Sequence, residues 1–121
     1  MAFDVEVIPN EARLFRRIND IHLVADGEIS SAAFNDPEMS VNWEKYSDAA
    51  SAADANSVCV ASLVAGECRA LEQIVVHCPV EPGQPFGPNQ SHSEVRGVKK
   101  KSVCRKLRDM AKNAIVWRKS V

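Results

Sequence analysis

The chain has 121 residues, of which 45% are hydrophobic and 26% charged, and these values are typical of one folded domain rather than of a disordered chain. Its apolar runs are too short for a membrane-spanning helix, and the N-terminus lacks the basic and apolar regions of a signal peptide. We therefore expect one domain over residues 1–121, located in the cytoplasm and without a membrane partner.

The formal net charge of −1 hides an uneven distribution of charge along the chain. Residues 96–121 hold ten Lys and Arg and one acidic residue, a formal charge of +9, whereas residues 1–95 hold five basic and fifteen acidic residues, a formal charge of −10. Such asymmetry is typical of a segment that binds polyanions or that docks on the acidic part of the protein. Docking between two copies would give a homo-oligomer, and the sequence does not distinguish it from docking within one copy.

Alternating apolar and polar residues predict a series of short strands. Residues 3–8 alternate Phe and Val with Asp and Glu, which predicts a half-buried strand that ends at Pro9-Asn10. Similar patterns predict extended segments at residues 13–18 (or a helical turn), 28–34, 39–43, 58–63, 74–78 and, as a sheet edge, 93–98. Residues 44–56 predict a surface helix or a loop, residues 66–72 a short helix, and the Gly- and Pro-rich residues 79–92 a loop.

The C-terminal region predicts an amphipathic helix over residues 102–119, with Ser102 as its N-cap. Its apolar stripe consists of Val103, Leu107, Met110, Ala114 and Trp117. We therefore expect an α+β fold, in which a small and mostly antiparallel sheet of about five strands packs against this helix.

The basic face of the predicted helix is the first candidate binding site. Arg105, Arg108, Lys112 and Lys119 fall within about 60° of one another around the helix axis. They could contact a nucleic acid backbone or an acidic protein, or they could form a solvated outer face. His92 follows the Gly- and Pro-rich loop and is a candidate for lining a cleft.

A second hypothesis concerns an arginine, a serine and an acid in that order along the chain. The residues are Arg16-Arg17, Ser30-Ser31 and a later acid, Glu72, Glu81 or Glu94. This order resembles the Arg-Ser-Glu arrangement of ADP-ribosyltransferase-like enzymes, although the Ser-Thr-Ser and Glu-x-Glu motifs are absent. The resemblance implies that Arg16 or Arg17 holds a phosphate of NAD, that Ser31 shapes the nicotinamide pocket, and that Glu72 stabilises charge on the ribose.

A wider pattern covers much of the chain. It consists of Leu14-Phe15-Arg16-Arg17, Ser30-Ser31-Ala32-Ala33-Phe34 and Met39-Ser40-Val41. This pattern resembles short bacterial proteins of unassigned function, and the resemblance implies a common fold but no particular activity.

The cysteines and histidines do not have the spacing of a structural zinc site. The candidate ligands are Cys59, Cys68, His77, Cys78 and His92, of which only His77 and Cys78 are close in sequence, and neighbours on a strand point to opposite faces. We expect reduced, mostly buried thiols, no metal and no cofactor. Common nucleotide-binding and hydrolase motifs are also absent. The sequence therefore favours a non-catalytic binding module over an enzyme.

Overall fold

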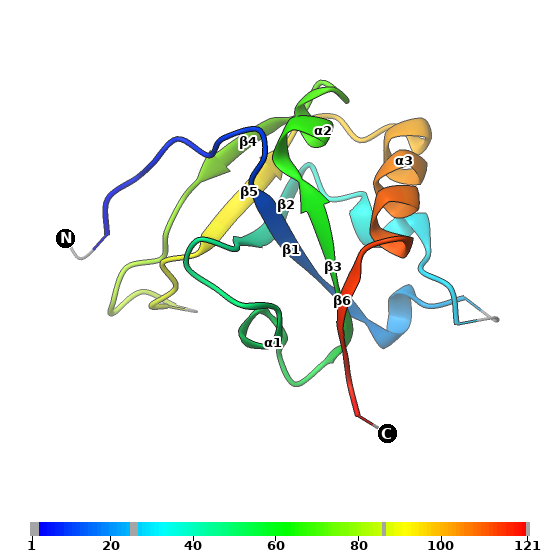
Figure 1. The fold of residues 1–121 in the computed structure, drawn as a ribbon, viewed down its shortest axis with the longest axis horizontal. Helices are drawn as coiled ribbons and strands as arrows, with labels where there is room; N and C mark the ends of the chain where they lie inside the picture. Colours follow the sequence, from blue (N-terminus) through cyan, green and yellow to red (C-terminus); the bar gives the residue numbers. More distant parts are fainter. Residues whose placement is uncertain (1–2, 25–26, 86, 121) are drawn as a thin grey trace.

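The computed structural model describes residues 3–24, 27–85 and 87–120 and shows an α+β protein with a six-stranded antiparallel sheet (Figure 1). The strands are β1 (Arg13–Asn19), β2 (Glu38–Trp43), β3 (Ser57–Val64), β4 (Ile74–His77), β5 (His92–Arg96) and β6 (Ile115–Arg118), in the order β4-β5-β2-β1-β3-β6. The helices are α1 (Ala49–Ala52), α2 (Ala65–Arg69) and α3 (Lys101–Lys112), with 3-10 turns η1 (Asp20–His22) and η2 (Ser31–Phe34). The predicted fold class is confirmed.

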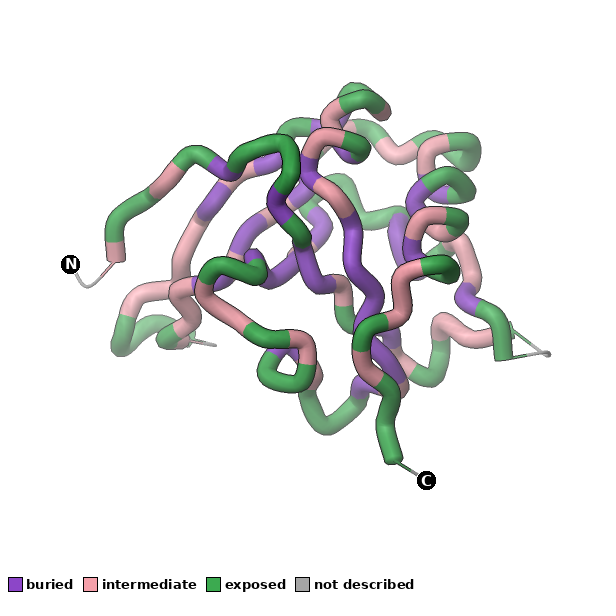
Figure 2. The backbone as a smooth tube through the Cα atoms, viewed as in Figure 1, coloured by how far each residue is buried: buried purple, intermediate pink, exposed green. Residues whose placement is uncertain are grey.

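The main hydrophobic core lies on one face of the central strands. Leu14 of β1 is opposite both Trp43 of β2 and Leu63 of β3, so one side chain contributes to packing across three strands. Helix α3 covers this face through Leu107 and packs against η2 and β3. Figure 2 shows the resulting band of buried residues along the central strands.

A smaller apolar cluster lies on the opposite face of the sheet. Phe15 of β1 and Val60 of β3 are buried there beneath Ala52 of α1, and Trp117 of β6 packs against them. Alternation along a strand explains this second cluster, because Leu14 and Phe15 are neighbours that point to opposite faces. Short helix α1 therefore serves to cover the part of the sheet that α3 does not.

The predicted strand over residues 3–8 is wrong. Its alternating pattern is real, but Val5 and Val7 are 73% and 90% exposed, and the segment has no strand pairing. Side chains hold it instead: the Glu6 N–H donates to Nδ1 of His77, and the Glu6 carboxylate binds Lys45 and Tyr46. These side-chain contacts, rather than ladder hydrogen bonds to the edge strand β4, position the segment.

The predicted strand over residues 28–34 is also wrong. Only Ile29 forms an isolated bridge, to Leu23, and the following residues form η2. The Ser30 hydroxyl accepts a hydrogen bond from the Ala32 N–H and so caps this turn. A serine side chain that bonds to the nearby backbone in this way competes with strand formation.

The segments predicted at 13–18, 39–43, 58–63 and 74–78 correspond to β1, β2, β3 and β4, and the short helix predicted at 66–72 corresponds to α2. The strand predicted at 93–98 exists as β5, but it lies between β4 and β2 rather than at an edge. The edges of the sheet are β4 and β6.

The C-terminal helix is shorter than predicted, and its N-cap differs. Helix α3 begins after Lys100, which is the N-cap in place of Ser102, and ends before Asn113. Trp117 therefore lies on β6, and Lys119 follows that strand. The β-branched pair Ile115-Val116 after Asn113 favours a strand, which pairs with the free edge of β3.

Candidate functional site

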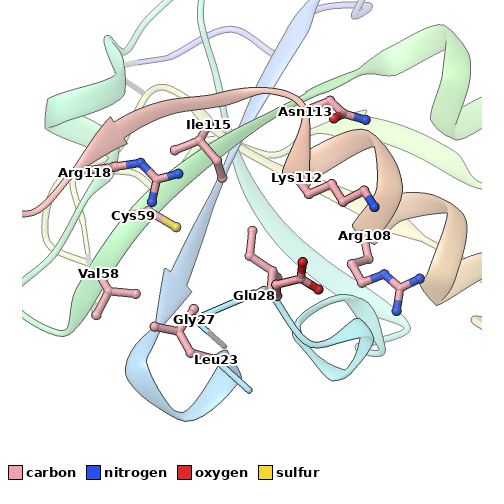
Figure 3. Close-up of a pocket in the computed structure, with 11 residues that line it drawn as sticks. Leu23, Gly27, Glu28, Val58, Cys59, Arg108, Lys112, Asn113, Ile115 and Arg118 are labelled. Carbon is pink, nitrogen blue, oxygen red and sulfur yellow. The ribbon is translucent and has the colours of Figure 1, made fainter. Parts of the chain in front are cut away.

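A cavity of about 510 Å³ lies where the C-terminal end of α3 meets β6, β3, Leu23 and residues 27–29 (Figure 3). Its apolar wall includes Leu23, Ile29, Val58 and Ile115. Its charged side chains are Arg108, Lys112, Arg118 and Glu28. We call this cavity the basic pocket, because three of its four charged lining residues are cations.

Two structural elements bring the three cations together. Arg108 and Lys112 are one turn apart on α3, so they lie on the same side of the helix. The chain reverses after Asn113, and β6 runs back along β3, where Arg118 is opposite Cys59. Figure 3 shows Arg118 approaching the pocket from β6, while Arg108 and Lys112 approach from the helix.

A buried thiol lies in the wall of this pocket. Cys59 is 4% exposed, and burial raises the pKa of its thiol, although the nearby Arg118 lowers it. Burial therefore disfavours the thiolate, which is the reactive form of cysteine.

Within the described residues, the cations of α3 form no ion pair with the acidic residues of the preceding part of the chain. The ion pair that α3 forms there is between Arg108 and its own neighbour Asp109, at 3.1 Å. The other ion pairs of the described ranges link Arg17 to Asp54, Lys45 to Glu6 and Arg96 to Glu94. The cations of α3 thus face solvent or the pocket.

A line of cations leads along α3 into the basic pocket. Lys101, Arg105, Arg108 and Lys112 follow one another at intervals of four, three and four residues, so they form one stripe about 17 Å long. Three of them are exposed, and Arg108 is half-buried at the pocket. We call these four residues the basic stripe.

The structure therefore places the predicted binding residues unequally. Arg108 and Lys112 line the pocket, and Arg105 lies on the stripe outside it. Lys119 is separate from the helix face, since it follows β6 and its N–H donates to the Val58 carbonyl. The sequence did not predict Arg118 as a binding residue. In a helix that continues to residue 119, Arg118 lies outside the basic face formed by Arg108 and Lys112.

The residues of the transferase hypothesis are not gathered in one place. The Arg16 guanidinium donates to the Ala33 carbonyl through Nε (3.2 Å) and Nη2 (2.8 Å) and to the Ser40 carbonyl through Nη1 (2.9 Å). Ser31 lies on η2, the turn that Arg16 holds. Glu72 is exposed before β4, which lies three strands from β1, or about 14 Å.

The other arginine and acids of that hypothesis lie elsewhere. Arg17 faces the opposite side of β1 and pairs with Asp54 at 3.4 Å. Glu81 lies in the loop after β4, and Glu94 lies on β5. NAD binding through Arg16 stays a prediction, and it would need the guanidinium to release the backbone carbonyls that it now holds.

His92 lies beside a thiol and does not line the basic pocket. Its Nδ1 is 3.4 Å from Sγ of Cys78 and 2.9 Å from the Cys78 carbonyl oxygen, and its Nε2 is 3.4 Å from Oγ of Ser40. Glu94 completes the group: one ligand atom from each of Cys78, His92 and Glu94 lies within 4.8 Å of the others. All three are partly buried.

This cluster is not arranged as a nucleophilic triad. Burial and the Glu94 carboxylate raise the pKa of the Cys78 thiol to about 11, so the thiol is protonated near neutral pH. The second nitrogen of His92 faces the Ser40 hydroxyl rather than a carboxylate. A triad needs the base oriented by an acid, and the contacts of His92 do not supply that orientation.

No protein-family model matches the chain, and neither a curated protein nor a solved structure does so at a significant level. Within the described ranges, no helix has both the length and the apolar character needed to cross a membrane. The candidate functional features of the described residues are the basic pocket, the basic stripe and the Cys78–His92–Glu94 cluster.

Proposed function

We propose that this chain is a non-catalytic module that binds a nucleic acid strand through the basic stripe and the basic pocket. One observation carries the proposal: Arg108, Lys112 and Arg118, from two different elements, line one cavity. Among the described residues, their one ion pair is that of Arg108 with its neighbour Asp109. Three cations and one carboxylate, Glu28, leave the pocket with an excess of positive charge, which favours an anionic ligand.

The length of the basic stripe and the volume of the basic pocket suit a ligand with several phosphates better than a single small anion. The basic stripe is about 17 Å long, which is enough to contact more than one successive phosphate of a strand. The cavity of about 510 Å³ at its end is within the usual size range for a small-molecule site. Leu23 and Ile115 give it an apolar wall, which can hold a sugar or a base while the cations contact phosphates.

The test measures binding of a labelled single-stranded oligonucleotide by fluorescence anisotropy at several salt concentrations. We expect affinity to fall with salt at a logarithmic slope of about −0.7 for each phosphate contacted. The double substitution Arg108→Ala and Lys112→Ala should weaken binding at least about tenfold and make the slope shallower by about 1.4, because two contacts are lost.

A matched control removes two positive charges elsewhere. Arg13 and Lys106 do not line the basic pocket; they line a shallower hollow beside Met110 and Ala114 that shares Asn113 with it. The double substitution Arg13→Ala and Lys106→Ala should leave the slope unchanged. Equal losses of affinity in both variants would show that net charge alone, and not the basic pocket, determines binding. Binding of poly-glutamate rather than the oligonucleotide through Arg108 and Lys112 would make the partner an acidic protein and overturn the proposal.

A further inference from the structure

The hairpin formed by β4 and β5 places three metal-binding side chains on one face of the sheet. Val76 is opposite Glu94, and the Cys78 N–H donates to the His92 carbonyl, which extends the pairing beyond β4. Opposite residues of an antiparallel pair share a face, as do residues two apart on one strand. Cys78, His92 and Glu94 therefore project from the same face, at the base of the loop over residues 79–91.

We propose that Cys78, His92 and Glu94 bind a zinc-like divalent cation, with the fourth coordination position left to water. A thiolate, an imidazole and a carboxylate are the protein ligands that Zn²⁺ accepts, and three protein ligands with a water are typical of an open site. Zn–S and Zn–N bonds of about 2.3 and 2.0 Å at a tetrahedral angle separate the two ligand atoms by about 3.5 Å. The distance from Cys78 Sγ to His92 Nδ1 is 3.4 Å.

The neighbouring groups suit this coordination. With Nδ1 on the metal in place of its contact to the Cys78 carbonyl, the Nε2–H of His92 can donate to Oγ of Ser40, 3.4 Å away. Glu94 accepts a bond from Nε of Arg96 at 2.8 Å through Oε1, so Oε2 is left for the metal. Ligands held by outer hydrogen bonds in this way are typical of metal sites.

The ligands match the charge of a divalent cation. The Cys78 thiolate and the Glu94 carboxylate together carry two negative charges and the neutral His92 imidazole adds none, while Arg96, bonded to Glu94, contributes one positive charge at the edge of the group. The Cys78 thiol loses its proton to solvent when the Sγ–metal bond forms, and no oxidant or reductant is involved. The fourth position remains open to solvent or to a small donor ligand.

Co²⁺ is the probe, because a cobalt–thiolate bond absorbs in the near ultraviolet and tetrahedral cobalt absorbs strongly in the visible. We expect both signals to saturate at one equivalent of Co²⁺ and to disappear on addition of Zn²⁺. Cys78→Ser should abolish the near-ultraviolet band, and His92→Asn and Glu94→Gln should each weaken binding at least about tenfold. Saturation without a thiolate band would overturn the proposal.

A control variant tests whether the cobalt signals require Cys78 in particular or are affected by the loss of another cysteine. Cys104 is buried in α3 and donates to the Phe34 carbonyl at 3.6 Å, a bond that serine can retain, so Cys104→Ser should keep both cobalt signals. Loss of the signals in Cys104→Ser but not in Cys78→Ser would contradict the assignment.

A measurement on the unmodified protein covers the case in which a variant fails to fold. Zn²⁺ should protect Cys78 from alkylation by iodoacetamide, with the modified cysteine identified by mass spectrometry. Unchanged alkylation of Cys78 in saturating Zn²⁺ would refute the site. None of these outcomes depends on the nucleic acid proposal, because Cys78 and His92 line neither the basic pocket nor the basic stripe.

Discussion

At the scale of single residues, the internal role of Arg16 can be tested against its neighbour. The Arg16 guanidinium makes three hydrogen bonds to two carbonyls, and burial lowers its pKa. Hydrogen bonds from a charged group contribute about 1.5–3 kcal/mol each, so the loss of bonding at two carbonyls in Arg16→Ala should lower the free energy of unfolding by about 3–6 kcal/mol. Arg16→Lys should recover less than half of this loss, because one ammonium cannot span both carbonyls.

Urea denaturation measures these differences, with Arg17→Ala as the matched control. Arg17 forms a half-exposed ion pair with Asp54 at 3.4 Å, and such pairs contribute about 0–1 kcal/mol. A stability of Arg16→Lys equal to that of the unmodified protein would show that the charge alone matters. In that case the bonds of the guanidinium to the Ala33 and Ser40 carbonyls would not be what stabilises the packing of η2 against β2.

Residue patterns could predict part of each candidate site and not the rest. The helical spacing of Arg108 and Lys112 is a local property, so the sequence was sufficient to place them on one face. Arg118 joins them only because the chain reverses after Asn113. The pairing of Cys78 with His92 depends on the register of β4 against β5, although two strand patterns that flank a Gly- and Pro-rich loop already indicate a hairpin.

At the scale of the secondary structure elements, the start of α3 leaves room for stabilisation. Its N-cap, Lys100, has extended φ and ψ angles but makes no side-chain bond to the first turn. A serine at this position can accept a hydrogen bond from the helix, so Lys100→Ser should raise the free energy of unfolding by about 0.5–1 kcal/mol.

Thermal denaturation is a sensitive measurement for this gain, and Lys100→Ala separates capping from the removal of a charge. The alanine variant should remain close to the unmodified protein in melting temperature. Equal melting temperatures for Lys100→Ser and Lys100→Ala would show that charge, and not the cap, determines the stability of this end of α3.

The elements that were mispredicted share a physical cause. Helical spacing continues through Ala114 and Trp117, and strand alternation is present at residues 3–8, but local periodicity does not specify whether a pairing partner exists. Residues 115–118 form a strand because β3 offers a free edge, whereas residues 3–8 are fixed by the contacts of Glu6. Both outcomes depend on parts of the chain that are distant in sequence.

At the scale of the whole molecule, the uneven charge should make stability respond to salt. Neighbours on the basic stripe repel one another by about 0.2–0.5 kcal/mol per pair. Raising sodium chloride from about 0.01 to about 1 M shortens the screening length from about 30 to about 3 Å, so we expect stability to rise by up to about 1 kcal/mol. Urea denaturation at both concentrations measures the change.

The opposite sign would have a different structural meaning. Loss of stability in high salt would show that the basic segment is held by the acidic part of the same or another copy. Lys101→Gln with Arg105→Gln serves as the control, because it removes most of the repulsion along the stripe and should flatten the response to salt.

The strand order has a consequence for how the protein is made. Strands β1, β2 and β3 form the centre of the sheet and precede the others in the chain, while the β4–β5 hairpin adds to β2 and β6 adds to β3. The sheet can therefore grow outward during translation. At about 5–20 residues per second, the ribosome needs about 3–11 s for residues 65–118. During this interval β2 and β3 expose free edges to other nascent chains, so chaperone contact is most valuable then.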